Sequence, residues 1–448
     1  MPSFAKLNQP RAIVFLVAFG CAGLFALLTN HAWEDYYITY RASKNLATGN
    51  GLVFNVGDRL HTFTSPLGVL LPATASLLTL NTSDVAALWI FRLMSCAAFG
   101  GAAALLFSTV RRGPETPLVA GVLAIAWLCT DSKSLDFSIN GMETGFMLLF
   151  LAYVLWGLFS PALKSRWLHL GLAWGGLMWT RPDSFIYIGL ITAAAWIFND
   201  SQRTGLTRKA WLAVIFKAAL VCTAVYLPWF VWAWIYYGSP VPHTIVAKAS
   251  VSAVDRDLPT LIKTLAQMPR LAWEGASTLD AAFLPTYFVA GGWPKVLILC
   301  ARAMGLLTAC LWLVPGVRSE TRAASIAFLG AHVYLTFFPY FPFPWYLPPT
   351  TFLAFFAWAC LAGQLLEFGR RSSGLRRTVA FASIFVVGGA QLGLQLWTVL
   401  AASKQMAALQ THIDTGNRRT IGEWLAANSS PGDRVFLEPL GYIGFSPD

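Results

Sequence analysis

Long apolar segments separated by short polar ones make up most of the chain. Apolar runs of about 18 or more residues are typical of helices that span a membrane. The apolar segments are residues 12–28, 67–80, 85–110, 117–130, 146–159, 168–179, 185–198, 211–236, 296–314, 324–338, 347–366 and 379–400. Several are too short for a full crossing, which is typical of segments that tilt or surround a cavity. The pattern predicts an all-α polytopic membrane protein with about 11 to 13 transmembrane or re-entrant helices.

The first long polar segment, residues 30–66, carries an adjacent carboxylate pair, Glu34 and Asp35. Residues 34–47 are expected to form a short helix, on which Arg41 shares a face with Glu34. Charges at a membrane boundary are costly unless they are solvated or used, so the pair is a candidate functional site. The alternative is that the two acids only mark the aqueous end of the first span.

Composition also indicates a membrane protein and argues against a nucleic-acid partner. The 448 residues are 56% hydrophobic and only 12% charged, whereas a soluble domain has about 25% charged residues. The net charge of +11 is spread over short loops, as the positive-inside rule predicts for cytoplasmic loops. These basic residues include Lys6, Arg11, Arg111, Arg112, Lys164, Arg166, Arg203, Arg208, Lys209, Arg318, Arg322, Arg370, Arg371, Arg376 and Arg377. A nucleic-acid partner needs a concentrated basic surface, and the sequence has none.

The basic loops also set the expected orientation. With the amino terminus inside, the outer segments are residues 30–66, 131–143, 181–184, 237–294, 339–345 and the tail after 401. Arg111 and Arg112 are also expected inside, which requires an odd number of crossings between residues 66 and 110. Either residues 67–80 form a re-entrant or surface segment, or these arginines break the rule. Both alternatives stay open.

The domain organisation follows from the same pattern. Residues 1–400 are expected to form one transmembrane domain, with 31–66 as its first outer loop and 237–294 as its largest outer loop. Residues 401–448 are expected to form a short outer segment with a helix, a turn, a strand and a glycine-punctuated end. The first apolar segment lacks a small-residue cleavage site and is expected to be a retained signal anchor. The seven cysteines lie in apolar runs without metal-ligand spacing and are expected to be buried hydrophobes.

Polar and aromatic side chains gather at the outer ends of the predicted spans. Besides Glu34 and Asp35 they are Tyr36, Arg41, Asn140, Glu143, Arg181, Asp183, His243, Lys248, Trp345, Tyr346 and Glu438. Glycosyl transfer from a lipid-phosphate sugar needs a carboxylate to take the acceptor proton and cations to hold the leaving phosphate. Asp35 or Glu34 would be the base. The candidate phosphate ligands are Arg181, Arg41, Lys248 and His243, and the candidates to stack on a sugar or flank a polyprenyl chain are Tyr36, Trp345 and Tyr346.

Each motif also has a structural explanation. Residues 181–183 could be a polar span end closed by a proline. Residues 140–143 could be a capping turn, with Asn140 at the helix start and Glu143 three residues on. His243 could be an ordinary loop histidine, and residues 345–346 could belong to an interfacial aromatic belt.

Six sequence blocks carry a resemblance to a known family. In chain order they are EDYYITYRASKNLATGNGLVFNVGDRLHTFTSPL, NGMET, TRPD, YYGSPVPHTIVAK, FPWYLPP and EPLGYIGF. They resemble bacterial GT-C membrane glycosyltransferases, in particular the mycobacterial terminal arabinofuranosyltransferases and the arabinosyltransferase of Pseudomonas type IV pilin. The resemblance implies a GT-C fold in the bacterial inner membrane and a decaprenyl-phosphate donor, with β-D-arabinofuranose used on the periplasmic side. It places the catalytic acids at Glu34 and Asp35.

The sequence departs from that family at three places. Glu34 stands where the family more often has Asp, and Pro-Val-Pro-His replaces the usual Pro-Asn at residues 240–243. The chain stops soon after Glu438, whereas the mycobacterial members continue into a soluble domain, which favours a pilin Ser or Thr over a cell-surface glycan as acceptor. Metal use differs among GT-C enzymes, and no ligand spacing here argues for a divalent ion. The non-enzyme alternative is a flippase or transporter for a lipid-linked sugar, which would be expected to bury charges at mid-membrane.

Overall fold

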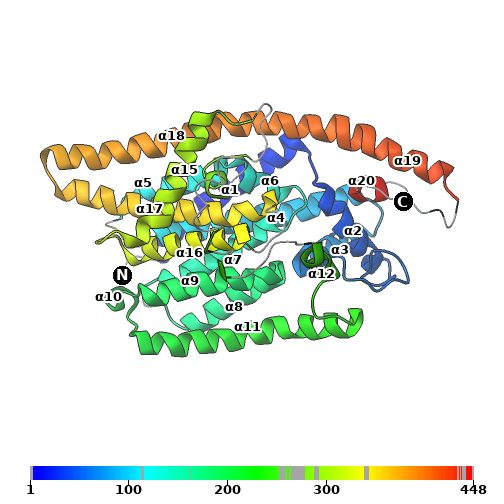
Figure 1. Cartoon of the computed structure of the whole chain (residues 1–448), viewed down its shortest axis with the longest axis horizontal. Coiled ribbons are helices and arrows are strands. Elements are labelled where there is room, and N and C mark those ends of the chain that lie inside the picture. Colours follow the sequence, from blue (N-terminus) through cyan, green and yellow to red (C-terminus); the bar gives the residue numbers. More distant parts are fainter. Residues whose placement is uncertain are drawn as a thin grey trace.

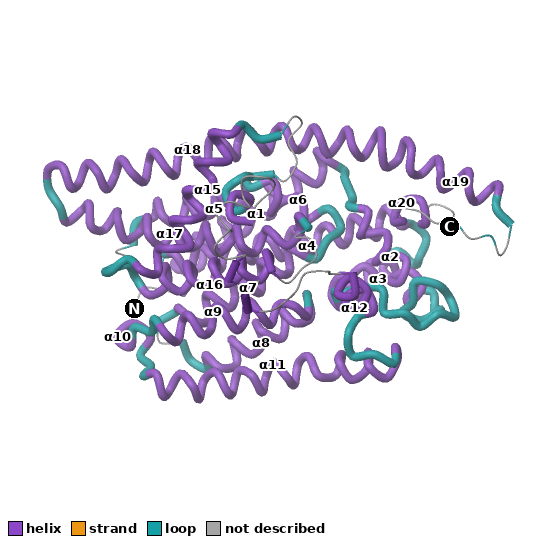
Figure 2. Tube along the Cα trace, in the orientation of Figure 1, coloured by secondary structure: helices purple, strands orange, loops and turns teal. Residues whose placement is uncertain are grey.

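The computed structural model describes residues 4–111, 116–161, 163–251, 258–259, 262–263, 278–286, 292–337, 343–430, 433, 435 and 440–445. Within these ranges every regular element is helical (Figure 2). The prediction of an all-α protein is therefore confirmed.

The helices follow one another with short connections. In the first half they are α1 (Phe4–Thr29), α2 (Glu34–Ala47), α3 (Pro66–Leu78), α4 (Asp84–Val110), α5 (Leu118–Thr130), α6 (Ser132–Ile139), α7 (Thr144–Phe159), α8 (Arg166–Thr180), η1 (Pro182–Ser184), α9 (Phe185–Ile197), α10 (Ser201–Thr204) and α11 (Arg208–Tyr237). In the second half they are α12 (His243–Val251), α14 (Thr278–Ala281), α15 (Lys295–Cys310), η2 (Leu311–Leu313), α16 (Ser319–Phe337), η3 (Pro344–Tyr346), α17 (Leu347–Arg371), α18 (Gly374–Ala408), the π-helical η4 (Leu409–Arg418), α19 (Arg419–Asn428) and α20 (Leu440–Phe445).

Several helices have the length and composition of membrane spans. Among the described residues six qualify, namely Gln9–Thr29, Asp84–Val110, Arg208–Tyr237, Lys295–Leu313, Pro344–Arg371 and Gly374–Asn428. The pair Leu118–Thr130 and Ser132–Ile139, bent by 60°, makes a seventh if it is one span. Shorter apolar helices are Pro66–Leu78, Thr144–Phe159 and Pro182–Ile197.

The two sides of the predicted topology lie at opposite ends of the molecule (Figure 1). The long helices run along its longest axis, with α18 and α11 on opposite flanks. The amino terminus and α10, which carries a basic loop, lie at one end. Helices α2, α3, α12 and α20 lie together at the other end. The fold thus places these four helices, which come from three separate parts of the chain, at one end of the molecule.

Helix α3 bears on the topology that the sequence left open. It has 13 residues and rises about 20 Å, less than the roughly 30 Å of a bilayer core. It packs against α2 and α4, at the end of the molecule that also holds α12 and α20. A surface or re-entrant position for α3 lets α4 alone carry Arg111 to the opposite end. The first of the two alternatives therefore fits the structure.

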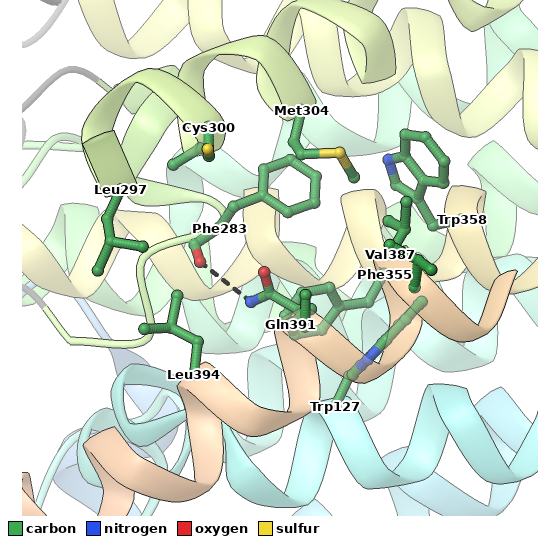
Figure 3. Close-up of a pocket in the computed structure, with 13 residues that line it drawn as sticks. Trp127, Phe283, Leu297, Cys300, Met304, Phe355, Trp358, Val387, Gln391 and Leu394 are labelled. Atoms are coloured by element: carbon green, nitrogen blue, oxygen red, sulfur yellow. Dashed lines mark hydrogen bonds between the residues drawn. The ribbon is translucent and has the colours of Figure 1, made fainter. Parts of the chain in front are cut away.

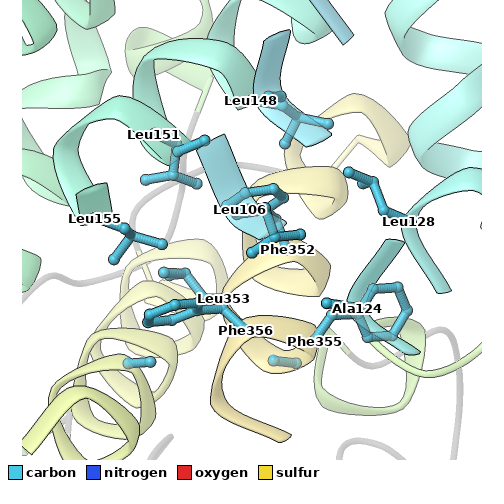
Figure 4. Packing of buried hydrophobic residues seen from close by; sticks show 14 of the residues in the cluster. Leu106, Ala124, Leu128, Leu148, Leu151, Leu155, Phe352, Leu353, Phe355 and Phe356 are labelled. Atoms are coloured by element: carbon cyan, nitrogen blue, oxygen red, sulfur yellow. The ribbon is translucent and has the colours of Figure 1, made fainter. Parts of the chain in front are cut away.

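The core lies between α4, α5, α7 and α17 (Figure 4). Leu106 of α4, Leu128 of α5, Leu151 of α7 and Phe352 of α17 meet there, each almost fully buried. In a lipid environment such close packing contributes dispersion energy that lipid contacts do not match. This core fixes the helix ends on which the polar residues sit.

Two segments differ from their predicted structure. Residues 131–143 were expected to be an outer loop, but they contain the buried helix α6, because Asp131 caps it through the backbone N–H of Ser134. The tail after residue 401 continues α18 without a break to Asn428. The predicted strand falls largely on residues outside the described part, and the glycine-punctuated end forms helix α20.

Candidate active site

Helix α2 spans residues 34–47, as predicted from the sequence. Its two acids occupy the first turn, where they interact favourably with the helix dipole. The turn at residues 140–143 holds the start of α2 in place. The N–H of Trp33 donates to Asn140 O at 2.9 Å, and Tyr36 packs directly on Gly141.

Gly141→Ala is expected to destabilise this contact. Gly141 has φ +95°, and an added Cβ would lie 2.6 Å from the Cβ of Tyr36. Gly205 also has a left-handed φ of +68° but open space around it, so Gly205→Ala is a matched control. Both substitutions carry strain of about 1–2 kcal/mol, and only Gly141→Ala adds overpacking of about 1–3 kcal/mol. Thermal unfolding of the purified variants measures the difference, and equal losses would contradict the packing.

A buried ion cluster surrounds Arg181 at the end of α8. Its Nε and Nη2 donate to the two carboxylate oxygens of Asp183 at 3.0 Å each, a bidentate pair. Its Nη1 donates to Glu143 Oε1 at 3.4 Å. The guanidinium also lies over the ring of Tyr346, 4.5 Å from its centroid, and the Tyr334 hydroxyl donates to Asp183 at 3.3 Å. Groups from three separate segments therefore contact the cation itself, and Tyr334 of a fourth segment contacts its partner Asp183.

Burial raises the pKa of the Glu143 carboxyl, although the neighbouring Arg181 opposes the shift. The carboxylate lies beneath the start of α3, where its Oε2 would be 3.6 Å from a Cβ on Gly68. A buried acid with a raised pKa beside an arginine is a frequent feature of functional sites, and also of structural ion pairs.

The turn at residues 140–143 contacts both the start of α2 and the ion cluster around Arg181. Asn140 contacts the start of α2 through Trp33, and Glu143 contacts Arg181 three residues later. One short turn thus connects the start of α2 with the arginine cluster.

The two neighbouring acids of α2 have different surroundings. Glu34 Oε1 accepts from the N–H of Gly441 at 3.0 Å, and Glu34 Oε2 lies 3.4 Å from Arg418 Nη1. Both Glu34 oxygens therefore hold the C-terminal part of the chain. Asp35 is half-buried on the adjacent face of α2. The engagement of both Glu34 oxygens counts against Glu34 as the candidate base.

Several predicted ligands lie away from Arg181. Arg41 Nη1 donates to Gly444 O at 2.5 Å and stacks on Phe54. The Nδ1 of His243 accepts from the N–H of His61 at 3.1 Å, which attaches α12 to the first outer loop. Burial and the charge of His243 lower the pKa of His61 to about 4. The side chain of Lys248 lies outside the described part of the structure.

The aromatic candidates divide. Tyr346 lies in the arginine cluster, and Trp345 stacks on Phe343 with 4.6 Å between ring centroids. Tyr36 is 1% exposed and stacks on Tyr40. Its ring packs in the core here, and its role beside a sugar or a polyprenyl chain stays a prediction. Glu438 lies outside the described residues.

The structural explanations are only partly right. Asn140 caps the end of α6 and donates its amide to Asp136, and Glu143 makes no capping hydrogen bond at α7. The capping-box explanation is therefore wrong. Helix α8 ends at Thr180 and Pro182 begins η1, so the proline does mark a boundary, in addition to the ion cluster.

Sequence reasoning missed a second polar network beside α2. His31 is 1% exposed, with its Nδ1 3.8 Å from Asp136 and its Nε2 3.6 Å from Asp414. Arg418 Nη1 donates to Asp414 at 2.8 Å. The closely spaced charges of residues 412–419 were a signal, but nothing in the sequence indicated that they pack on the other end of the chain.

An open apolar pocket of about 290 Å³ lies between α5, α15, α17 and α18 (Figure 3). Trp127, Phe355 and Trp358 line it, and Gln391 donates to Phe283 O at 3.0 Å across one side. Trp127 belongs to the last turn of α5, directly before the bend into α6. In the described part of the chain, no group of three or more His, Cys, Asp or Glu is arranged to hold a metal ion.

Comparisons with known proteins bear on both fold and function. No family model matches the sequence. The terminal β-(1→2)-arabinofuranosyltransferase of Corynebacterium glutamicum is 31% identical over 274 residues, which are 55% of this chain and 38% of that protein. The chain therefore spans less than half the length of this curated relative.

Two solved structures share the architecture. ArnT from Cupriavidus metallidurans bound to undecaprenyl phosphate has a TM-score of 0.59 at 12% identity, covering 98% of this chain and 85% of ArnT. The Archaeoglobus fulgidus oligosaccharyltransferase tethered to an acceptor peptide has a TM-score of 0.55 at 13% identity, covering 96% of this chain and 60% of that protein. Both are GT-C glycosyltransferases. The chain has the GT-C fold, as the resemblance implied.

Proposed function

We propose that this chain is a membrane glycosyltransferase that moves D-arabinofuranose from a polyprenyl phosphate to a periplasmic hydroxyl, that of a Ser or Thr of type IV pilin. The inner membrane of a bacterium is its expected location. The observation that carries the proposal is the packing of the start of α2, through Trp33 and Tyr36, against the turn whose Glu143 pairs with Arg181. This packing lies in a bundle with the GT-C fold.

The chemistry assigns one role to each group. The acceptor oxygen forms a bond to the anomeric carbon while the bond from that carbon to the phosphate oxygen breaks. Asp35 takes the proton of the acceptor hydroxyl, as a general base. The leaving phosphate keeps the electron pair of the broken bond and needs hydrogen-bond donors where its charge develops.

Arg181 is the described cation best placed for that charge. Its contact with Glu143 is 3.4 Å long, against 3.0 Å for each contact with Asp183. Protonation of Glu143, favoured by its raised pKa, would free the Nη1 donor for a phosphate oxygen while Asp183 keeps the guanidinium in place. Lys248 on α12 remains a further candidate phosphate ligand.

The assignment of the donor lipid and the assignment of the sugar are supported by different observations. The pocket of Figure 3 is lined mostly by aromatic and aliphatic side chains, which suit a prenyl chain. The structurally similar ArnT was solved with undecaprenyl phosphate. Arabinofuranose is supported by the partial match to the corynebacterial enzyme. The pilin acceptor is supported by the sequence resemblance.

Mass spectrometry of periplasmic and pilin proteins, with and without the gene, tests the proposal. A pentose mass on pilin that disappears with the gene, and returns with the parent gene but not with an Asp35→Asn copy, is the expected result. Unmodified pilin in all strains with a pentose lost from a surface glycan would assign a polysaccharide acceptor instead. If the purified protein moved a lipid-linked sugar across the bilayer without transferring the sugar to an acceptor, the proposal that it is an enzyme would be refuted.

A further inference from the structure

We propose that the C-terminal arm, defined as η4 (Leu409–Arg418) and α20 (Leu440–Phe445), is a clamp that positions the first turn of α2 and thereby Asp35. Gln410 and Tyr442 are its positioning residues. The role of Asp35 rests on the proposed function, whereas the clamp itself is a property of the fold.

The clamp begins with hydrogen bonds to Ala32, two residues before the start of α2. The N–H of Ala32 donates to Gln410 Oε1 at 3.0 Å, across 378 positions of sequence. The Tyr442 hydroxyl lies within donating distance of Ala32 O at 2.8 Å and of Gln410 Oε1 at 2.9 Å. All of these groups are buried, so losing one partner leaves a backbone group unsatisfied away from water. Both backbone groups of Ala32 are thus fixed from the arm.

The second contact is on Glu34. Its carboxylate accepts from the N–H of Gly441 and pairs with Arg418. The approach is so close that a Cβ on Gly441 would lie 2.2 Å from the backbone O of Glu34. Only glycine allows this contact without a shift of α2.

Helix α20 then covers one face of α2. The ring of Tyr37 lies 4.5 Å from that of Tyr442 and 5.2 Å from that of Phe445. Lys44 lies over Phe445 at 5.3 Å, and Arg41 donates to Gly444 O. Residues 37, 41 and 44 follow helical spacing, so α20 contacts α2 along most of its length. The turn at residues 140–143 supports α2 from a different element.

Charged groups on the other side of η4 also connect the arm to the rest of the chain. Asp414 in η4 is 1% exposed and contacts both His31 and Arg418. Burial lowers the pKa of His31, but the carboxylates of Asp136 and Asp414 outweigh it and the net direction is upward. A protonated His31 would join η4 to α6. Such π-helical turns are often found at functional sites, and here the turn carries Gln410 and Asp414 to α2.

The consequence is a positioning role. An error of about 1 Å in the position of a reacting group lowers catalysis by about 100-fold. Asp35 is the residue that follows Glu34, so movement of the first turn moves its carboxylate. The arginine cluster, which is the proposed phosphate site, is built from α8, η1, η3 and the turn at residues 140–143. The contacts of the arm given above are instead with α2 and the residues that precede it.

Tyr442→Phe tests the clamp because it removes one hydroxyl and keeps the ring on Tyr37. Tyr153→Phe is a matched control, since the Tyr153 hydroxyl bonds His169 Nδ1 at 2.7 Å between α7 and α8. We expect Tyr442→Phe to speed amide hydrogen exchange over residues 32–37. With polyprenyl-phosphate arabinofuranose as donor, kcat should fall about 10-fold or more while KM for the donor stays unchanged.

Gly441→Ala is a second variant, expected to give the same pattern with a larger fall in kcat. Its control is Gly389→Ala in α18, where no atom lies within 4 Å of an added Cβ. Unchanged exchange over residues 32–37 in both arm variants would overturn the clamp, as would an equal loss of kcat in Tyr153→Phe. If the parent protein transfers no sugar, the proposed function fails, and the exchange measurement still decides whether the arm holds α2.

Discussion

Asp35→Asn is expected to abolish sugar transfer while leaving folding intact. The amide keeps the size of the side chain but cannot take the proton of the acceptor hydroxyl. General-base catalysis contributes about 10²- to 10⁴-fold, so activity should fall by about that factor. The variant should remain folded, since the substitution removes no core packing. Single-turnover transfer in detergent or nanodiscs measures the first effect.

Glu34→Gln is the matched control for Asp35→Asn. The two acids are adjacent and both belong to the first turn of α2. An amide at position 34 still accepts from the N–H of Gly441 but loses the charge that faces Arg418. Activity should therefore fall much less than in Asp35→Asn. The reverse order would identify Glu34 as the base, and parent-like activity in Asp35→Asn would remove Asp35 from that role.

Arg181→Ala is expected to have the second largest effect. It leaves Glu143 and Asp183 without their shared cation in a buried site, which typically costs about 3 to 5 kcal/mol of stability. Loss of a donor to the leaving phosphate should lower transfer by about 10²- to 10³-fold. Donor dependence should change more than acceptor dependence. Titrating each substrate separately measures that difference.

The pH dependence of Arg181→Ala is a further readout. Arg181 lowers the pKa of Glu143, so its removal raises that pKa further. An acid with a raised pKa in the folded state lowers stability as pH rises above its ordinary value of 4.5. Stability of the variant should therefore fall more steeply than that of the parent as pH rises from that value. Parallel stability curves would contradict a shared charge cluster.

Arg318→Ala controls for the loss of a bidentate arginine. Arg318 donates to both oxygens of Glu367 at the end of α17 that carries the basic loops. It should lower stability without changing donor dependence. If Arg181→Ala and Arg318→Ala changed donor dependence equally, the phosphate role of Arg181 would be lost.

Local structure was the part that sequence predicted best. Helix α2 has the range expected from its polar spacing, because Gly49 and Gly51 adopt left-handed conformations just beyond its end. The helix boundary at Arg181-Pro182 followed from proline stereochemistry. By contrast, α6 was expected to be a loop, since polar residues in a short buried helix resemble those of an outer connection.

For the candidate site, the sequence predicted the end of the bundle at which each residue lies but not the residues that it contacts. Glu143, Arg181 and Tyr346 do meet, as expected for outer span ends. Arg41 and Glu34, however, contact the C-terminal arm, and His243 contacts the first outer loop. Hydropathy and charge specify which end of the bundle a residue occupies. They carry no information about which residues at that end are in contact.

By itself the sequence determined the membrane class, the helical character, the end of the bundle that holds the acids and the resemblance to GT-C enzymes. Those properties depend on period, length and charge, which are local. Only the tertiary structure decided that Glu34 holds the arm, through a hydrogen bond from the N–H of Gly441 and an ion pair with Arg418. It also decided that Ala32 is fixed by a residue 378 positions away. Such contacts arise from the packing of whole helices, and no local pattern encodes them.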